Sequence, residues 1–223
     1  IYMIINHDNS NLIIIEKKNE VYITVDCESD IQREISEFFT FYVPGYKFMP
    51  AFRNRMWDGK IRLFSQKTKE IYFGLYPYIK AFAEERGYNI VAGKDIDIDN
   101  KVDKDVVTKF SNSLGQKFEA RDYQIDAIFH SLKRNRTLLV SPTASGKSFI
   151  IYSLIRYYTH LIKENVNNRI LLIVPTTSLV EQMYTDFESY GWNVKKYCHR
   201  LYSGYSNQTD KKVLISTWQS LYK

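Results

Sequence analysis

The sequence Ser141-Pro142-Thr143-Ala144-Ser145-Gly146-Lys147-Ser148 decides the fold of this chain. An apolar run at 137–140 precedes it, and an apolar helical pattern begins at Phe149. A short strand, a loop of small residues ending in Gly-Lys-Ser, and a helix together predict a phosphate-binding loop, or P-loop. Backbone N–H groups of such a loop, with the N-terminus of the next helix, bind phosphate oxygens. We therefore expect a nucleotide-binding α/β domain.

The individual residues of this loop have distinct expected roles. Lys147 is expected to neutralise the β- and γ-phosphates of a nucleotide, and Ser148 to bind the accompanying Mg²⁺. The other predicted nucleotide-binding residues of the loop are Thr143, Ala144, Ser145 and Gly146. Ser141 stands where this motif usually has glycine, and serine adopts a positive φ less readily than glycine. The small side chains still leave the backbone amides accessible to phosphate.

The composition is that of a globular chain with an anionic partner. At 223 residues and 44% hydrophobic residues, the chain has room for one large or two small domains. Its net charge of +6 favours an acidic partner if the basic residues are clustered. Cys27 and Cys198 lack the spacing of a zinc site or a disulfide framework, so we expect two inert thiols. No apolar run approaches the roughly 18 residues of a membrane span, and we expect a cytoplasmic protein without membrane contact.

The first hundred residues predict a small α+β domain. Apolar runs at 2–5, 11–15 and 21–25 predict an antiparallel sheet, and Ile31 and Ile35 begin a helical pattern. A further helix is expected at 75–87, ending at a glycine, and a further strand at 88–91. A domain boundary is expected near 92–102. The acidic residues Asp95, Asp97 and Asp99 of this boundary fit a solvated connection better than a calcium loop, which would need a later glycine and glutamate.

The stretch 45–69 is strongly basic, with seven lysines and arginines against one acid. Asp58-Gly59 is a two-residue hairpin signal, which would pair Trp57 with Lys60 and set Arg55 opposite Arg62. Such a like-charge pair favours an anion over the strands, and a nucleic-acid backbone is one. The predicted nucleic-acid-binding residues here are Arg53, Arg55, Trp57, Lys60 and Arg62. A solvated hairpin, whose arginines lie over its own aromatic rings, is the alternative.

The second half repeats a strand, turn and helix order. A helix is expected from Arg121, and Gln124 near its start has the amide donor and acceptor that suit an adenine edge. A strand at 169–174 leads through a turn at 175–178 into a helix, and a strand at 212–216 leads into a turn at Thr217. Such βα units predict a parallel sheet that binds ligands at its carboxyl edge. Thr176 and Thr177 are placed to hold a phosphate, although helix capping explains them almost as well.

The order of these motifs resembles the first RecA-like domain of a superfamily 2 helicase. The resemblance rests on Tyr123-Gln124, on 142–148, on 173–182 and on 215–221. The front half resembles the accessory domain of the UvsW-type helicases of T-even-type phages, and this resemblance runs over nearly the whole chain. The matching front residues are Gly45-Tyr46, Phe48, Pro50, Phe52-Arg53, Trp57-Asp58-Gly59 and Ile61-Arg62-Leu63.

This resemblance implies an α/β chain of three parts. Residues 1–95 would be a small α+β accessory domain that has an antiparallel sheet and binds nucleic acid, and 96–120 a linker with a short helix. Residues 121–223 would be a RecA-like P-loop domain with a partial parallel sheet. By the same resemblance Gln124 would contact adenine. The residues lining the strand-binding side would be Pro175, Thr176, Thr177 and Thr217.

The resemblance also implies a function. It indicates an ATP- and Mg²⁺-dependent DNA and RNA/DNA helicase that remodels branched intermediates of recombination, repair and replication. The expected form is a monomer in the cytoplasm of an infected bacterial host. Superfamily 2 motors need an Asp-Glu box and an arginine finger from a second RecA-like domain. No Asp-Glu dipeptide occurs in the chain. We therefore expect an N-terminal fragment, truncated before that box and without catalytic residues, that binds ATP and DNA but neither hydrolyses nor unwinds.

Two other functions remain open at this point. A translocase subunit of a restriction system shares the same motifs. A stand-alone nucleic-acid-binding module with a vestigial P-loop would also explain the basic stretch. A small-molecule kinase fits least, because the βα order is that of a motor.

Overall fold

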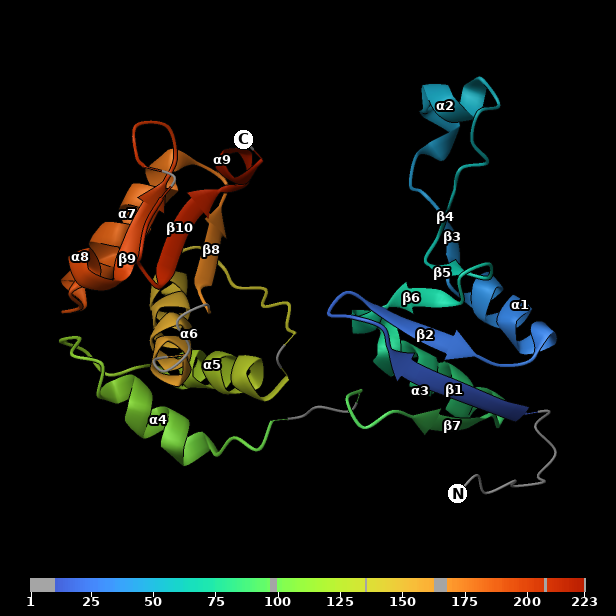
Figure 1. Ribbon diagram of the computed structural model, residues 1–223, viewed down its shortest axis with the longest axis horizontal. Helices are drawn as coiled ribbons and strands as arrows, with labels where there is room; N and C mark the ends of the chain where they lie inside the picture. Colours follow the sequence, from blue (N-terminus) through green and yellow to red (C-terminus); the bar gives the residue numbers. More distant parts are fainter. Residues whose placement is uncertain (1–10, 97–99, 135, 163–167, 207, 223) are drawn as a thin grey trace. The chain divides into compact units, whose positions relative to one another are not determined.

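The computed structural model describes residues 11–96, 100–134, 136–162, 168–206 and 208–222. The chain divides into two compact units, Ile1–Ile98 and Asp99–Lys223 (Figure 1). Each unit has its own hydrophobic core. None of the helices in these described stretches combines the length and the apolar character needed to cross a membrane.

A five-stranded sheet, sheet A, forms the centre of the first unit. Its order is β5-β6-β2-β1-β7, and its neighbours are antiparallel except β1 and β7, which run parallel. Ile13 and Ile15 are fully buried while Ile14 is exposed, the alternation that strand geometry imposes. The strands are β1 (Leu12–Lys17), β2 (Tyr22–Asp26), β5 (Phe64–Ser65), β6 (Glu70–Tyr72) and β7 (Asn89–Ala92).

Three of the four strands predicted in this unit are confirmed, at 11–15, 21–25 and 88–91. The fourth, at 2–5, lies outside the described residues. Because the last strand of the unit joins β1 in parallel, the sheet is mixed rather than purely antiparallel.

Two predicted helices complete the core of the first unit. They are α1 (Ser29–Phe38) and α3 (Tyr76–Arg86). The 3-10 turn η3 (Phe73–Leu75) lies directly before α3. Ile35 of α1 and Phe82 of α3 are fully buried in one cluster with the inward side chains of sheet A. Gly87 ends α3 with a φ of 72°, a conformation that glycine adopts without steric cost. The predicted end of this helix is confirmed.

The basic stretch lies in an excursion from sheet A. Strands β3 (Thr40–Tyr42) and β4 (Lys60–Arg62) form a separate antiparallel pair. Between them the chain forms the 3-10 helix η2 (Tyr46–Phe48) and the short helix α2 (Pro50–Arg53), with Pro50 at the first helical position. We call residues 45–58 the tip lobe. Figure 1 shows α2 at the far end of β3 and β4, well away from sheet A.

The predicted hairpin at Asp58-Gly59 is wrong in its pairing. Arg62 lies opposite Thr40 rather than Arg55, and Lys60 lies opposite Tyr42 rather than Trp57. Residues 50–53 are helical, so they offer no extended backbone, and β4 pairs instead with a strand upstream of the lobe. The like-charge pair of arginines therefore does not exist.

The second unit is built on sheet C, whose three strands are all parallel in the order β8-β10-β9. This confirms the predicted parallel sheet, although β9 and the short helix α8 before it were missed. The strands are β8 (Ile170–Val174), β9 (Cys198–Leu201) and β10 (Val213–Thr217). The helices are α4 (Lys104–Asn112), α5 (Asp122–Arg134), α6 (Lys147–Leu161), α7 (Thr177–Ser189), α8 (Val194–Tyr197) and α9 (Trp218–Leu221).

The strand predicted at 137–140, before the P-loop, is absent from this structure. These residues have no strand assignment, and Leu138 and Val140 are 89% and 93% exposed. An apolar run becomes a strand only where a neighbouring strand supplies hydrogen-bond partners. None of the strand pairs in the described part of the chain includes this segment.

The segment after the acidic boundary packs into the second unit instead of lying free as a linker. Val107 of α4 is fully buried in the cluster formed by α5, α6 and α7, while its neighbour Val106 is 60% exposed. The hydroxyl of Tyr152 on α6 donates to the carbonyl of Leu114, 3.1 Å away. Burial of one face of α4 thus makes this helix part of the second unit.

The P-loop has a left-handed residue at an unexpected position, in addition to Gly146. Ala144 has a φ of 62°, whereas Ser141 is not among the described residues with positive φ. The hydroxyl groups of Ser141 and Ser145 are hydrogen-bonded to each other across the loop. Serine at the first position therefore costs no backbone strain, and its side chain closes the loop.

Both thiols are in protected surroundings. Burial raises the pKa of Cys198 to about 12 and that of Cys27 to about 11. A thiolate is the reactive form of cysteine, so neither thiol is reactive at neutral pH. This agrees with the inert role that the spacing predicted.

Replacing Val107 by Ala should lower the free energy of unfolding of the second unit by about 2 kcal/mol, because a buried side chain is lost. Val106→Ala, one position away on the exposed face of α4, is the control and should have little effect. The free energies of unfolding of both variants are measured by urea titration, with hydrogen exchange of the amides of α5 and α6 as the probe. Equal effects of the two variants would show that α4 is not packed in this unit.

Replacing Ala144 by Gly should stabilise the loop. A residue with a Cβ in the left-handed conformation costs about 1–2 kcal/mol, and glycine removes this cost. Glycine also makes the unfolded chain more flexible, which offsets part of the gain. The net increase in the free energy of unfolding should be about 0.5–1 kcal/mol. Thermal unfolding checks this, with Ala127→Gly inside α5 as a control that should destabilise. A lower melting temperature for Ala144→Gly would contradict the assigned backbone conformation.

Candidate functional site

The P-loop holds Lys147 at the first position of α6 with its ammonium group turned into the loop. Its Nζ donates to the carbonyl oxygens of Pro142 at 2.6 Å and Ser141 at 3.1 Å. Pro142, Thr143 and Ala144 are exposed, so the backbone around the ammonium group is open to a ligand. A phosphate arriving here meets a cation and the positive end of a 15-residue helix.

The start of α5 fixes the loop from the other side. The carbonyl of Ser145 accepts from the hydroxyl of Tyr123 at 2.9 Å and from Nε2 of Gln124 at 3.2 Å. Oε1 of Gln124 accepts from the backbone N–H of Arg121 at 3.0 Å. A Cβ on Gly146 would lie 2.4 Å from Nε2 of Gln124, so only glycine leaves room for this amide.

Both ends of the Gln124 amide are therefore used within the protein. The side chain is 5% exposed, so adenine reaches its second amide N–H and second oxygen lone pair only if the side chain or its surroundings move. Its predicted adenine contact stays a prediction. The structure gives it a second role that the sequence did not indicate, which is to tie α5 to the P-loop.

A cavity of about 530 Å³ lies between the start of α5 and the P-loop. Its lining is mostly apolar with a few polar groups, which suits a flat base more than a charged group. Arg121 and Tyr123 were missed in the sequence; their position beside Gln124 was the available signal. The lining residues include Arg121, Tyr123, Ala127, Leu139, Val140, Thr143, Ala144, Ser145 and Ile150.

The residues present fit a nucleotide with its magnesium ion. The loop supplies exposed backbone and one ammonium group for phosphate, and the cavity beside it accepts a base. Ser148, at the second position of α6, is partly exposed and supplies the hydroxyl oxygen that Mg²⁺ prefers. When bound, the ion would supply positive charge at the phosphates.

A second groove lies at the carboxyl ends of β8 and β10. Its volume is about 610 Å³. It brings together all four residues that were predicted to contact a nucleic-acid strand in this unit. The lining residues are Pro175, Thr176, Thr177, Tyr202, Ser203, Tyr205, Thr217, Gln219 and Ser220. None of these side chains is charged, so this groove offers hydroxyl and amide groups rather than cations.

The threonines of this groove also serve the local structure. The hydroxyl of Thr176 caps α7 by accepting from the N–H of Leu179 at 3.3 Å. The hydroxyl of Thr217, 4% exposed, is hydrogen-bonded to that of Ser220 at 2.9 Å. The capping interpretation of Thr176 is thus confirmed, and the predicted strand contacts are not excluded by it, because the cap leaves other N–H groups of α7 without helical partners.

Tyr202 and Tyr205 reach this groove from the loop after β9 and were missed in the sequence. Glu181 of α7 accepts from the hydroxyl of Tyr202 at 2.6 Å and from Arg200 at 2.5 Å. The hydrogen bond from Tyr202, followed by the hydrogen bond and the charge of Arg200, lowers the pKa of Glu181. The guanidinium of Arg200 lies 4.6 Å from the ring centre of Tyr205. No sequence pattern pointed to this cluster, because its members come from separate elements.

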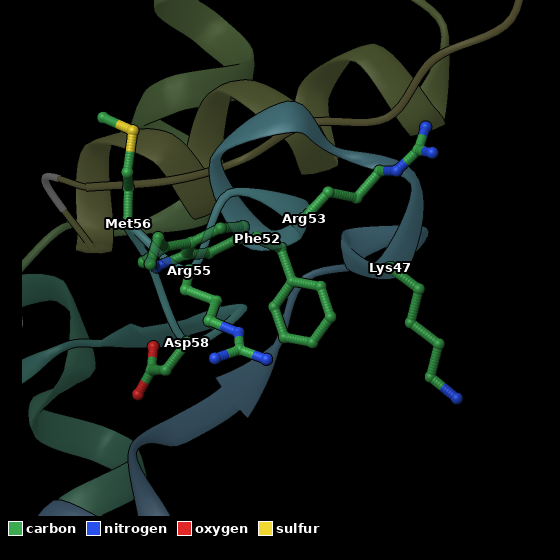
Figure 2. A pocket seen from close by; sticks show the side chains of 7 residues that line it. Lys47, Phe52, Arg53, Arg55, Met56 and Asp58 are labelled. Carbon is green, nitrogen blue, oxygen red and sulfur yellow. The ribbon is translucent and has the colours of Figure 1, made fainter.

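The tip lobe holds the third group of candidate residues. Lys47, Arg53, Arg55, Met56 and Trp57 line an open groove of about 590 Å³, together with Phe52 and Asp58. Figure 2 shows the Lys47 and Arg53 side chains extending outward and Met56 pointing in another direction. The structure thus brings three of the five predicted basic-stretch residues, Arg53, Arg55 and Trp57, to one groove.

Lys60 and Arg62 lie on β4, outside that groove. Arg62 forms an ion pair with Asp58, and their hydrogen bond lowers the pKa of the carboxyl group. Lys60 lies 4.9 Å from the ring centre of Tyr42. Trp57 is half-buried, and its indole N–H donates to the carbonyl of Lys60 at 2.9 Å. The positive charge of Arg62 is therefore partly neutralised within the protein.

Two known families match the chain, one within the first unit and one within the second. Residues 13–93 match the family described as DNA helicase UvsW, N-terminal. Residues 117–223 match the family described as type III restriction enzyme, res subunit. A Dicer-like protein 2-2 of Aspergillus niger is 33% identical over 106 residues, which are 46% of this chain and 7% of that protein.

The ATP-dependent DNA helicase uvsW of Enterobacteria phage T4 is 34% identical over 211 residues. This alignment covers 91% of the present chain but spans only 41% of the T4 protein. One crystal structure of the T4 UvsW helicase superposes with a TM-score of 0.80 at 32% identity, covering 94% of this chain and 76% of that one. A second crystal structure of T4 UvsW superposes with a TM-score of 0.81 at 33% identity, covering 95% of this chain and 44% of that one. The chain belongs to the UvsW family of helicases.

Proposed function

We propose that this chain is the ATP-binding front part of a helicase that remodels branched DNA and RNA/DNA hybrids in recombination, repair and replication. ATP and Mg²⁺ are its proposed cofactors, held by the P-loop from Thr143 to Ser148 with Gln124 beside it. Branched or single-stranded DNA and RNA/DNA hybrid are its proposed partners. The proposed form is a monomer that acts in the cytoplasm of an infected bacterial host.

One observation carries this proposal. The P-loop and the groove with the threonines lie in the same unit and share one hydrophobic core: the P-loop leads into α6, and the groove lies at the carboxyl ends of β8 and β10. Lys147 begins α6, and Thr176 caps α7. A motor couples the binding of a nucleotide to the movement of a nucleic-acid strand, so both binding sites must belong to one folded unit. This arrangement supports a motor over an isolated binding module.

We further propose that these 223 residues bind ATP without hydrolysing it or unwinding DNA. Phosphoryl transfer to water needs an acidic group for the metal and the water, and an arginine for the charge that develops. The P-loop supplies neither, and the sequence has no Asp-Glu dipeptide. The proposed nucleic-acid contacts are therefore those of a binding surface.

A translocase subunit of a restriction system is the second candidate. The match of residues 117–223 to the res-subunit family supports it. The first unit, with its UvsW-type match, favours the helicase. A nuclease activity associated with the same polypeptide would reverse this order.

Replacing Lys147 by Ala should weaken ATP binding about tenfold to a hundredfold, the effect of removing a charged hydrogen-bond donor. Hydrogen exchange of the P-loop and the start of α6, with and without Mg²⁺-ATP, measures it. Lys109→Ala, which removes the same charge on the exposed face of α4, is the control and should keep full protection. Absence of protection in the unchanged protein at millimolar ATP would favour the stand-alone binding module.

Replacing Arg53 by Ala and Arg55 by Asn should weaken DNA binding and reduce the salt dependence of the affinity. Each phosphate contact contributes about 0.9 to the slope of log K against log salt, so the pair should remove up to about 2. Asn is chosen at position 55 because Arg55 has a φ of 57°, which asparagine tolerates. Lys80→Ala, which removes one exposed positive charge on α3 outside the tip lobe, is the control and should leave the slope unchanged. An unchanged slope would remove the tip lobe from the DNA-binding surface.

A further inference from the structure

The tip lobe carries two apolar side chains that nothing else in the lobe covers. We infer that Phe48 and Met56 are junction-contacting residues, which pack against bases unstacked where the strands of branched DNA part, while the neighbouring cations hold the phosphates. This inference rests on the proposed function, because it assigns a substrate feature to the same DNA-binding surface.

The first observation is exposure. Phe48 is 84% and Met56 is 80% exposed, although both are large apolar side chains. Single exposed apolar residues are common on proteins, but these two lie within nine residues of each other on one small lobe. They offer contact area without a partner in the described part of the chain.

The second observation is that the lobe already has its own apolar support. The ring of Tyr46 stacks on that of Tyr42, with centres 4.7 Å apart, and meets that of Phe52 edge-on at 4.8 Å. A Cβ on Gly59 would lie 2.3 Å from the Tyr46 ring, so only glycine allows this ring to pack directly against the backbone. Phe48 and Met56 take no part in these ring contacts. They are therefore available for a partner while the lobe itself stays packed.

The third observation is the backbone that holds Met56. Arg55 has a φ of 57°, a conformation that costs a residue with a Cβ about 1–2 kcal/mol. The next N–H, that of Met56, donates to the carbonyl of Ala51 at 2.9 Å. This turn directs the Met56 side chain away from Lys47 and Arg53, as Figure 2 shows. Strain of this kind is kept where a side chain must be aimed.

The charge around these side chains selects the partner. Residues 45–57 contain Lys47, Arg53 and Arg55 and no acid. The nearest acid, Asp58, is held by Arg62. A partner must therefore offer anions beside flat apolar surface. Branched DNA does so, because phosphates flank bases that have lost a stacking neighbour, and Phe and Met are side chains that proteins insert at such steps.

A fluorescence experiment tests this assignment. A fork with 2-aminopurine at the base pair next to the branch is mixed with the full chain, and the same label is placed in an unbranched duplex. We expect fluorescence to rise on the fork and not on the duplex. The double variant Phe48→Ala, Met56→Ala should lose most of this rise, and its preference for fork over duplex should fall about tenfold, as for one lost stacking contact.

The controls separate this inference from the proposed function. Val21→Ala, which removes an apolar side chain that is 52% exposed elsewhere in the first unit, should behave as the unchanged protein. A double variant that binds DNA and keeps both the fluorescence rise and the fork preference overturns the inference and leaves the proposed function standing. No DNA binding by the unchanged protein defeats both. Loss of binding to phosphatidylserine vesicles in the double variant, with fluorescence retained, would assign the lobe to a lipid surface and overturn the inference.

Discussion

The hydrogen bonds to the carbonyl group of Ser145 hold the P-loop in place within the second unit. This carbonyl accepts hydrogen bonds from Tyr123 and Gln124, so the P-loop is bound to the start of α5 as well as to α6. Within the loop, Lys147 donates to two further carbonyls and Ser141 bonds to Ser145. A phosphate that draws Lys147 away from these carbonyls changes the loop, and Gln124 is in position to carry that change to α5.

The two proposed nucleic-acid-binding surfaces carry different kinds of side chain. The groove at the edge of sheet C is lined by uncharged side chains, whereas the tip lobe has three cations and no acid between 45 and 57. Hydroxyl and amide contacts depend weakly on salt, and phosphate contacts to lysine and arginine depend on it steeply. The lysine and arginines of the tip lobe are therefore expected to make the salt-dependent part of the proposed contacts.

Two of the wrong structural predictions, the hairpin pairing and the strand at 137–140, share one cause, which is that strand pairing is not local. Asp58-Gly59 is a sound turn signal, and Gly59 does have a φ of 79°. Yet β4 pairs with β3, eighteen or more residues upstream, because the residues just before the turn fold as α2. Leu138 and Val140 have the composition of a strand but no paired neighbour among the described strands.

The sequence by itself determined the elements whose signals are local. The Gly-Lys-Ser loop before a helix, the helix end at Gly87 and the parallel βα order all depend on neighbouring residues, and the structure has them as predicted. Only the tertiary structure decided which side chains meet. It placed Tyr202 beside Thr176, buried the amide of Gln124 against the loop, and left Phe48 and Met56 exposed. Contacts between distant segments depend on packing of the whole core, which no single stretch of sequence contains.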